Sequence, residues 1–259
     1  MTEGDDTEST TPRNLRFLLI LEEVARVGVP MTPTEINQNI GLPKQTLHRL
    51  FATLESEGFL QRELDGRTYS PGPRMRAMSV GILSSARAQA ARLMVMEGLA
   101  ASIGETCNLV IPDRLDMLYV DRVETNWPLR IQFPIGSHVP FYCTASGKLY
   151  LASLPAAQLR PMVKACKFVK LAKNTITSPA KLLAEVERIR EQGYSTDNQE
   201  FVDGMIAVAT AITDPQGNMV ASLAFHAPTP RMDLGQALAH LDTLKKAAVE
   251  LSRILGNDM

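Results

Sequence analysis

The chain has 259 residues, of which 45% are hydrophobic and 21% charged, and its formal net charge is −1. This composition excludes a disordered chain, and the length suffices for two domains. No apolar run approaches the roughly 18 residues of a membrane span, and no basic region precedes an apolar core, so we expect neither a membrane segment nor a secretion signal. The three cysteines are far apart and lack C-x-x-C spacing, which favours a reducing, cytoplasmic location without a metal site.

Charge is unevenly distributed along the chain. Residues 1–12 hold four acidic residues and no basic one, so we expect a disordered acidic tail there. Residues 13–76 hold nine Lys/Arg and seven Asp/Glu, a surplus of two positive charges. Such a surplus is a weak electrostatic footprint for nucleic acid. If the chain binds DNA, a few well-placed contacts, duplicated in a dimer, must supply the affinity.

The stretch from Thr32 to Gly58 predicts two short helices joined by a tight turn. Thr32 and Glu35 form a capping-box pattern at the start of the first helix, and Gly41 ends it. The second helix begins near Pro43. Its apolar residues recur at helical spacing and form one stripe: Leu47, Leu50, Phe51 and Leu54.

The opposite face of this second helix carries side chains of the types that contact base edges and phosphates. They are Lys44, Gln45, Thr46, His48 and Arg49. Arg49 suits a bidentate contact with guanine and Gln45 one with adenine, although each is equally compatible with phosphate contact alone. The pattern is typical of a helix-turn-helix whose second helix enters the major groove of DNA.

A preceding helix over about 14–27 and a following hairpin complete a predicted winged helix over 13–73. Extended runs at 59–62 and 67–70 flank Asp65-Gly66, which is a hairpin signal. Arg67 lies at the wing, where a phosphate or the minor groove is within reach; the alternative is a plain solvated hairpin. Over 74–103 we expect linker and dimerisation helices with a break near 81–85, or else a helix packed only on its own domain.

The remainder, 104–259, alternates short strands and helices. We expect strands at 107–111, 117–123, 129–133, 206–213 and 220–226, helices at 145–154, 181–192 and 233–255, and a loop over 134–144. Strands in one sheet with helices on its faces predict an α/β sensor domain, so the fold class of the whole chain is α+β.

Four segments in series resemble one family. GLPKQTLHRLFATLESEGFL with the following YSPGPRM resembles the winged helix of the IclR family of bacterial transcriptional regulators. VPFYCTASGKLYLA, EVERIREQGYSTDNQEFVDGM and DPQGNMVASLAFHAP resemble three segments of its effector-binding domain. The resemblance implies a GAF-like C-terminal domain that binds a small metabolite, and homodimers formed through the DNA-binding half and linker, commonly paired into tetramers.

A candidate effector site surrounds the start of the helix expected at 145–154. Thr144 can cap this helix, which leaves the N–H groups of Ala145, Ser146 and Gly147 to attract a carboxylate. The resemblance carries pocket positions over to Ala145, Ser146, Asp197, Met205, Ala207, Ala224 and His226. Thr144 joins the site as the cap, and from chemistry alone we add Arg130 and Tyr142. For Lys148, the alternative to a binding role is an exposed position on the helix face.

The site departs from family members that recognise short oxo acids, because Ala224 and His226 stand where hydroxyl side chains are usual. We therefore favour an aromatic or longer acid. For His226, a core histidine bonded to the backbone is an equal alternative. Without the resemblance, Asp197 is more simply a turn residue.

The leading hypothesis is a ligand-responsive regulator, repressor or activator, that binds double-stranded DNA, senses a small carboxylic acid and controls a catabolic operon without a cofactor. The alternative is an enzyme with Cys143 as nucleophile, because a thiol just before a helix N-terminus is expected to have a lowered pKa. A third possibility is a winged helix that contacts protein instead of DNA.

Overall fold

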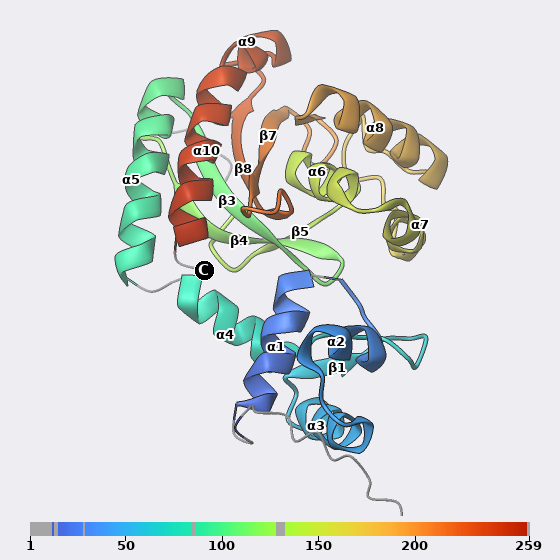
Figure 1. The fold of residues 1–259 in the computed structure, drawn as a ribbon. Coiled ribbons are helices and arrows are strands. Elements are labelled where there is room, and N and C mark those ends of the chain that lie inside the picture. Colours follow the sequence, from blue (N-terminus) through green and yellow to red (C-terminus); the bar gives the residue numbers. More distant parts are fainter. Residues whose placement is uncertain (1–11, 13–14, 28, 84–85, 128–132, 258–259) are drawn as a thin grey trace, which may run out of the picture. The chain divides into compact units, whose positions relative to one another are not determined.

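The structure is a computed structural model that describes residue 12 and residues 15–27, 29–83, 86–127 and 133–257. Its contacts divide the chain into two units, Met1–Ile82 and Leu83–Met259, which we describe separately. The first unit contains α1 (Arg16–Val27), α2 (Pro33–Ile40), α3 (Lys44–Ser56), β1 (Leu60–Arg62), β2 (Tyr69–Pro71) and most of α4 (Pro73–Leu83) (Figure 1).

The helix pair α2–α3 forms as its sequence predicts. The Thr32 side chain accepts the N–H of Glu35, and the backbone N–H of Thr32 donates to Glu35 Oε2 at 2.7 Å, which completes the capping box. Gly41 follows in the left-handed conformation, with a φ of 70°. The apolar stripe of α3 is buried in one core with Ile20 of α1 and Tyr69 of β2. The cap and the core together fix which face of α3 is left in solvent.

The hairpin β1–β2 is held by its turn and by a close backbone approach. Asp65 accepts the backbone N–H groups of Arg67 and Thr68, and Gly66 has a φ of 67°. Behind β2, a Cβ on Gly72 would lie 2.3 Å from the carbonyl oxygen of Gly58, so only glycine fits there. The predicted three helices and hairpin are therefore present.

The second unit is one antiparallel sheet covered by helices on both faces. The sheet order is β5-β4-β3-β8-β7-β6. Its strands are β3 (Thr106–Asp113), β4 (Asp116–Val123), β5 (His138–Pro140), β6 (Ser195–Asn198), β7 (Met205–Thr213) and β8 (Met219–Pro228). The helices are α5 (Ala86–Ile103), α6 (Ala145–Ser153), α7 (Ala156–Ala165), α8 (Pro179–Gln192), α9 (Leu234–Ala239) and α10 (Leu241–Asn257).

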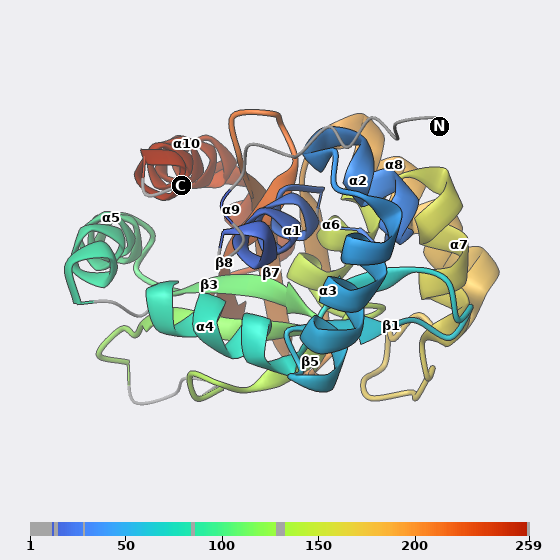
Figure 2. The same cartoon turned by 60° about the horizontal axis from the view of Figure 1, so that its bottom comes forward.

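The two faces of this sheet differ in what covers them. Figures 1 and 2 show α5 and α10 on one face and α6, α7 and α8 on the other. Alternate residues of β3, β7 and β8, such as Leu109, Val208 and Phe225, pack in the core with α5 and α10. Their neighbours Ala207, Ala209 and Ala224 pack with α6. Small side chains on this second face let α6 approach the sheet closely.

Several predicted elements need correction. The expected helix over 233–255 is two helices, because α9 ends at the cap residue His240. The expected loop over 134–144 contains β5, and α7 and β6 were not predicted. The strand expected at 107–111 continues through Asp113 as β3, so the turn before β4 lies at Arg114 and Leu115. Most of the strand expected at 129–133 lies outside the described residues.

Candidate functional site

The exposed face of α3 carries the residues predicted to contact DNA. Lys44, Gln45, His48 and Arg49 are exposed and Thr46 is half-buried, while the apolar stripe faces inward. Arg67 is exposed in the turn of the β1–β2 hairpin. These side chains are thus available to a partner.

A second group lies on the sheet face that α6 covers. Asp197, Ala207 and His226 stand directly opposite one another across β6, β7 and β8. Ala224 occupies the same face of β8, two residues before His226, and Met205 the same face of β7. The register therefore brings five of the predicted effector residues onto one surface. In the sequence these five residues lie in three separate segments.

The first turn of α6 faces this surface. Thr144 accepts the N–H of Gly147 at 3.1 Å and donates its hydroxyl to the carbonyl of Pro140 at 2.7 Å. Ala145 and Ser146 are buried, and Ser146 Oγ accepts a hydrogen bond from Ser222 of β8 at 2.9 Å. The expected cap is present. It occupies the Gly147 N–H, which we expected to be free for an anion, so this N–H is not available.

Tyr142 and Arg130 are the two effector residues that we added from chemistry. The hydroxyl of Tyr142 donates to the carbonyl of Val169 at 2.9 Å and accepts its N–H at 3.1 Å. Tyr142 is buried in the core beneath α6 and α8. Arg130 lies outside the described residues.

Three polar side chains beside this surface were missed by the sequence analysis. Asn108 of β3 lies between Arg122 of β4 and His226 of β8. Its amide nitrogen is 3.0 Å from His226 Nδ1, and its oxygen accepts Arg122 Nη1 at 3.0 Å. Arg122 also pairs with Glu124 at 2.8 Å. A signal was present, since Asn108 and Arg122 are polar residues inside runs predicted as buried strands.

An aromatic cluster adjoins His226 and was also missed. The ring of Phe133 lies 5.3 Å from that of Phe201, 5.9 Å from that of Tyr119 and 6.3 Å from the imidazole of His226. These separations suit edge-to-face and offset contacts between rings. The cluster joins β4, β8 and two loops, so no local pattern reveals it.

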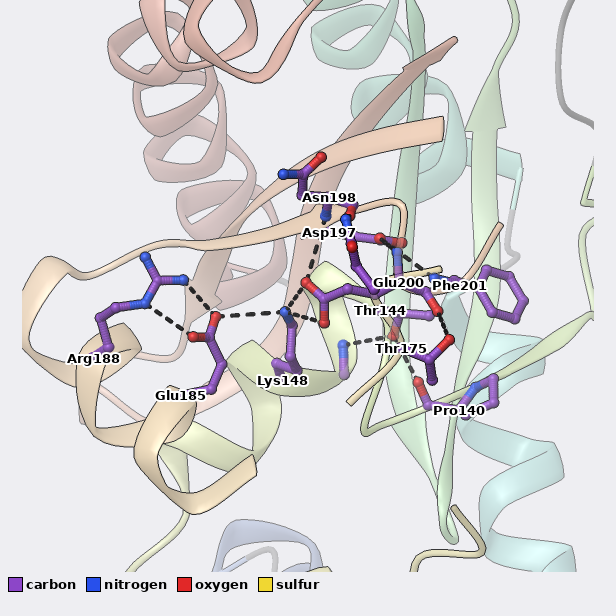
Figure 3. Close-up of polar contacts among 12 residues, drawn as sticks. Pro140, Thr144, Lys148, Thr175, Glu185, Arg188, Asp197, Asn198, Glu200 and Phe201 are labelled. Carbon is purple, nitrogen blue, oxygen red and sulfur yellow. Dashed lines mark hydrogen bonds and ion pairs between the residues drawn. The ribbon is translucent and has the colours of Figure 1, made fainter. Parts of the chain in front are cut away.

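Lys148 is not exposed on the helix face. Its side chain is fully buried, and its Nζ lies 2.5 and 2.6 Å from the two carboxylate oxygens of Glu200 (Figure 3). A longer contact of 3.5 Å reaches Glu185 of α8. The ion pair joins α6 to the turn after β6. Its partner is 52 residues away in sequence, which is why helical spacing gave no indication of it.

Two groups near this ion pair have shifted pKa values. Burial raises the pKa of Asp197 to about 7, and the nearby Glu200 acts in the same direction, while two backbone N–H donors and the charge of Lys148 oppose the shift. Burial also raises the pKa of the Cys143 thiol, which nearby Asp197 and Glu200 reinforce. The expected lowering for Cys143 is therefore wrong, because desolvation outweighs the helix N-terminus.

The strand β4 also contacts the linker-side helix α5. Asp121 accepts Arg92 Nε at 2.7 Å and Gln89 Nε2 at 3.1 Å, and both members of the Arg92–Asp121 pair are buried. A register shift in the β3–β4 pairing, at Leu109, places Asp121 on the α5 side while the next residue, Arg122, pairs with Asn108. Consecutive residues of one strand thus contact the helix and the candidate site.

Other classes of site find no support in the part of the chain that the structure describes. No cluster of three or more His, Cys, Asp or Glu side chains there could hold a metal ion. Within the same residues, no helix is both long and apolar enough to cross a membrane.

Comparison with known proteins decides the family. Residues 80–253 match the model of the bacterial transcriptional regulator IclR C-terminal domain, and residues 15–64 match the IclR helix-turn-helix domain. The chain belongs to the IclR family of bacterial transcriptional regulators. The helix-turn-helix assignment and the α+β class are thereby confirmed, and the comparisons identify a DNA-binding regulator and not an enzyme.

Individual IclR-family proteins are similar over nearly the whole chain. The probable transcriptional regulator SauR of Cupriavidus necator is 39% identical, with 92% of this chain and 94% of that protein covered. The crystal structure of the Thermotoga maritima IclR has a TM-score of 0.63 at 28% identity and covers 93% of this chain and 97% of that one. An IclR homologue from Microbacterium hydrocarbonoxydans, crystallised with 4-hydroxybenzoate, shares the fold, with a TM-score of 0.59 at 20% identity over 92% of this chain and 98% of that one.

Proposed function

We propose that this chain is a ligand-responsive regulator that binds operator DNA through α3 as a homodimer or a dimer of dimers. Its effector is a small carboxylic acid, with an aromatic acid favoured, and its target is a catabolic operon. The observation that carries the proposal is that one sheet face unites His226, Ala207 and Ala224 with the start of α6 and an aromatic cluster. As a DNA-binding bacterial regulator it acts in the cytoplasm.

The residues support distinct roles in effector binding. The first turn of α6 offers a helix N-terminus to a carboxylate, and the alanines of β7 and β8 form the apolar sheet face beside it. Phe133 and Phe201 offer faces for an aromatic ring. The homologue from Microbacterium hydrocarbonoxydans is complexed with 4-hydroxybenzoate, a compound of this chemistry. We therefore prefer an aromatic acid to a two- or three-carbon one.

A route from the site to the DNA-binding half passes along β4. An effector that shifts His226 and Asn108 acts on Arg122, and the adjacent Asp121 holds Arg92 of α5. We propose that α5, as part of the linker over 74–103, passes this change on along the linker and alters the separation of two α3 helices in a dimer. Half-sites lie a fixed number of helical turns apart, so a small change in separation alters DNA affinity.

The DNA half of the proposal is tested with Arg49→Ala. DNA selected by the wild-type protein from a random duplex library serves as probe, and retardation in a gel measures affinity. We expect at least tenfold weaker binding with an unchanged dimer in sedimentation, because one good base contact contributes about 1–3 kcal/mol. Arg160→Ala, an exposed arginine of α7, is the matched control. Retardation equal to wild type removes Arg49 from the interface.

The effector half is tested by a thermal-shift screen of benzoate, 4-hydroxybenzoate, acetate and glyoxylate, each beside its neutral amide. A ligand at a hundred times its dissociation constant adds about 2.7 kcal/mol of stability. We expect shifts with the aromatic acids and none with their amides. Shifts confined to acetate or glyoxylate contradict the preference for an aromatic acid, and an absence of shifts with any acid contradicts the carboxylate site.

A further inference from the structure

Two carboxyl side chains contact the buried ammonium group of Lys148, and a third, that of Asp197, lies next to Glu200 (Figure 3). Glu185 comes from α8, Asp197 from β6 and Glu200 from the turn that follows β6. Lys148 Nζ contacts both oxygens of Glu200 at 2.5 and 2.6 Å. Glu185 lies 3.5 Å from Lys148 and has Arg188 as a second cation at 2.6 Å. The cations are thus engaged with Glu185 and Glu200.

Asp197 is the carboxyl of the three that makes no ion pair with Lys148, whose charge acts on it only at longer range. The residue is only 1% exposed, and its Oδ1 accepts the backbone N–H of Glu200 at 2.7 Å and of Phe201 at 3.4 Å. Among the residues that the structure describes, no ion pair reaches it. A buried carboxylate beside a second carboxylate is disfavoured relative to its neutral form.

Asp197 also borders the proposed effector site. It lies directly opposite Ala207 across β6 and β7, and Ala207 packs with Ala145, the first residue of α6. An acid bound at the start of α6 therefore brings its own carboxylate towards Asp197. Two anions that lie close together in a site shielded from water repel each other unless one of them gains a proton.

This inference rests on the proposed effector site. We propose that Asp197 takes up one proton from solvent when an acidic effector binds, and that its carboxyl O–H then donates a hydrogen bond to the effector carboxylate. The proton remains on Asp197, the effector stays an anion, and no covalent bond to the effector forms. Asp197 thereby selects an acid over its amide or ester and makes effector affinity depend on pH.

Other titratable groups packed around Asp197 do not replace it in this role. Burial raises the pKa of Tyr119 on β4 to about 12 and also raises that of Cys143, so both are neutral near pH 7. Lys148 and Glu200 compensate each other. His226 lies two strands away, on the far side of Ala207. Its contact with Asn108 links it to the other end of the site.

Effector affinity should fall as the pH rises, because the acid binds to the form of the protein in which Asp197 is protonated. A free carboxyl whose pKa lies near 7 is mostly protonated at pH 6 and mostly ionised at pH 8. Benzoate is an anion throughout this range. We therefore expect a constant dissociation constant below about pH 6 and a rise that approaches tenfold per pH unit above pH 7.

The experiment is calorimetric titration of the full-length protein with benzoate, 4-hydroxybenzoate and acetate at pH 6, 7, 8 and 9. Two buffers of different ionisation enthalpy at each pH give the number of protons taken up. For wild type we expect close to one proton per acid at pH 8. Asp197→Asn keeps a hydrogen-bond donor without titrating, so its dissociation constant should not vary with pH. Asp242→Asn, an exposed aspartate of α10, is the matched control and should behave as wild type.

The outcomes separate this inference from the proposed function. Binding of an acid with equal affinity at pH 6 and 9, or with the wild-type pH dependence retained in Asp197→Asn, overturns the inference alone. An absence of binding by every acid at pH 6 overturns the carboxylate effector together with the inference. If Asp197→Asn does not fold, the proton count of the wild type decides alone: a count near zero at pH 8 overturns the inference, and a count near one supports it.

Discussion

Lys148 and Glu200 form a buried ion pair in which each charge depends on the other. The side chain of Lys148 has no exposed surface, and that of Glu200 is 9% exposed. Such a pair contributes little net stability compared with well-packed apolar side chains, but removal of one partner leaves the other charge buried and unpaired. The pair therefore makes the underside of α6 sensitive to single substitutions.

We predict that Lys148→Met lowers the free energy of unfolding by about 3–5 kcal/mol at pH 7, because Glu200 is left as an uncompensated buried carboxylate. The double variant with Glu200→Gln should lose less than the sum of the two single losses. Urea unfolding at pH 7 measures both.

The pH dependence of this variant provides its internal check. Burial already raises the pKa of Glu200, and loss of Lys148 removes the nearest charge that opposes this shift. Protonation of Glu200 then relieves the variant, so its stability deficit should shrink between pH 7 and pH 5. Lys181→Met, at an exposed position of α8, should change stability by less than about 0.5 kcal/mol. A deficit for Lys148→Met as small as that of this control contradicts the prediction.

At the scale of elements, the entry into α6 is fixed by contacts on both sides of Thr144. Its hydroxyl oxygen caps Gly147 and its hydrogen reaches the carbonyl of Pro140 in β5. Gly147 also permits a close backbone crossing, because a Cβ there would lie 2.4 Å from Phe141 Cα and 2.6 Å from its carbonyl oxygen. The orientation of the proposed effector-binding turn thus depends on a cap and on a glycine.

We predict that Gly147→Ala destabilises the protein by about 1–3 kcal/mol or more, because the backbone of Phe141 must move to admit the methyl group. Gly98→Ala in α5 is the matched control, since a Cβ there meets nothing within 4 Å. The control should stabilise by about 0.5–1 kcal/mol, the usual gain from replacing a helical glycine. Thermal unfolding compares the two, and equal effects of the same sign contradict the prediction.

Elements defined by local chemistry could be predicted, whereas those defined by a distant partner could not. The caps at Thr32 and Thr144 follow from residues within four positions of each helix start. In contrast, β5 and β6 have only three and four residues, and their strand character comes from pairing with β4 and β7. At the end of α9 the cap residue is His240, and no Gly or Pro stands there to predict a helix end from the sequence.

In the candidate effector site too, the sequence supplied single positions, and contacts between distant segments arranged them. The resemblance supplied Asp197, Ala207 and His226 as separate positions, but their alignment across three strands comes from the sheet register. Lys148 and Glu200 were missed because residues 52 positions apart carry no mutual signal in one sequence. Sequence thus indicated the fold class and the recognition helix, and the tertiary structure was needed to define the charge environment of the site.

The charge of the whole molecule determines how it should bind DNA. With a net charge of −1, attraction to DNA must come from a few cations on α3 and the hairpin. Each phosphate contact releases counterions, so the logarithm of affinity falls with that of salt at a slope of about −0.9 per contact. In a dimer every contact is made twice. The change in slope on removing one phosphate-binding side chain therefore indicates how many protomers contact the operator.

We predict that Lys44→Ala reduces the salt slope of operator binding by about two in a dimer complex, because one phosphate contact is lost from each protomer. Affinity should fall for selected and random duplexes alike, whereas Arg49→Ala should chiefly lower discrimination between them. Fluorescence anisotropy between 50 and 300 mM salt measures the slope, and Lys164→Ala, an exposed lysine of α7, is the control. A slope unchanged by Lys44→Ala excludes Lys44 from phosphate contact, and a change near one indicates that a single protomer contributes it.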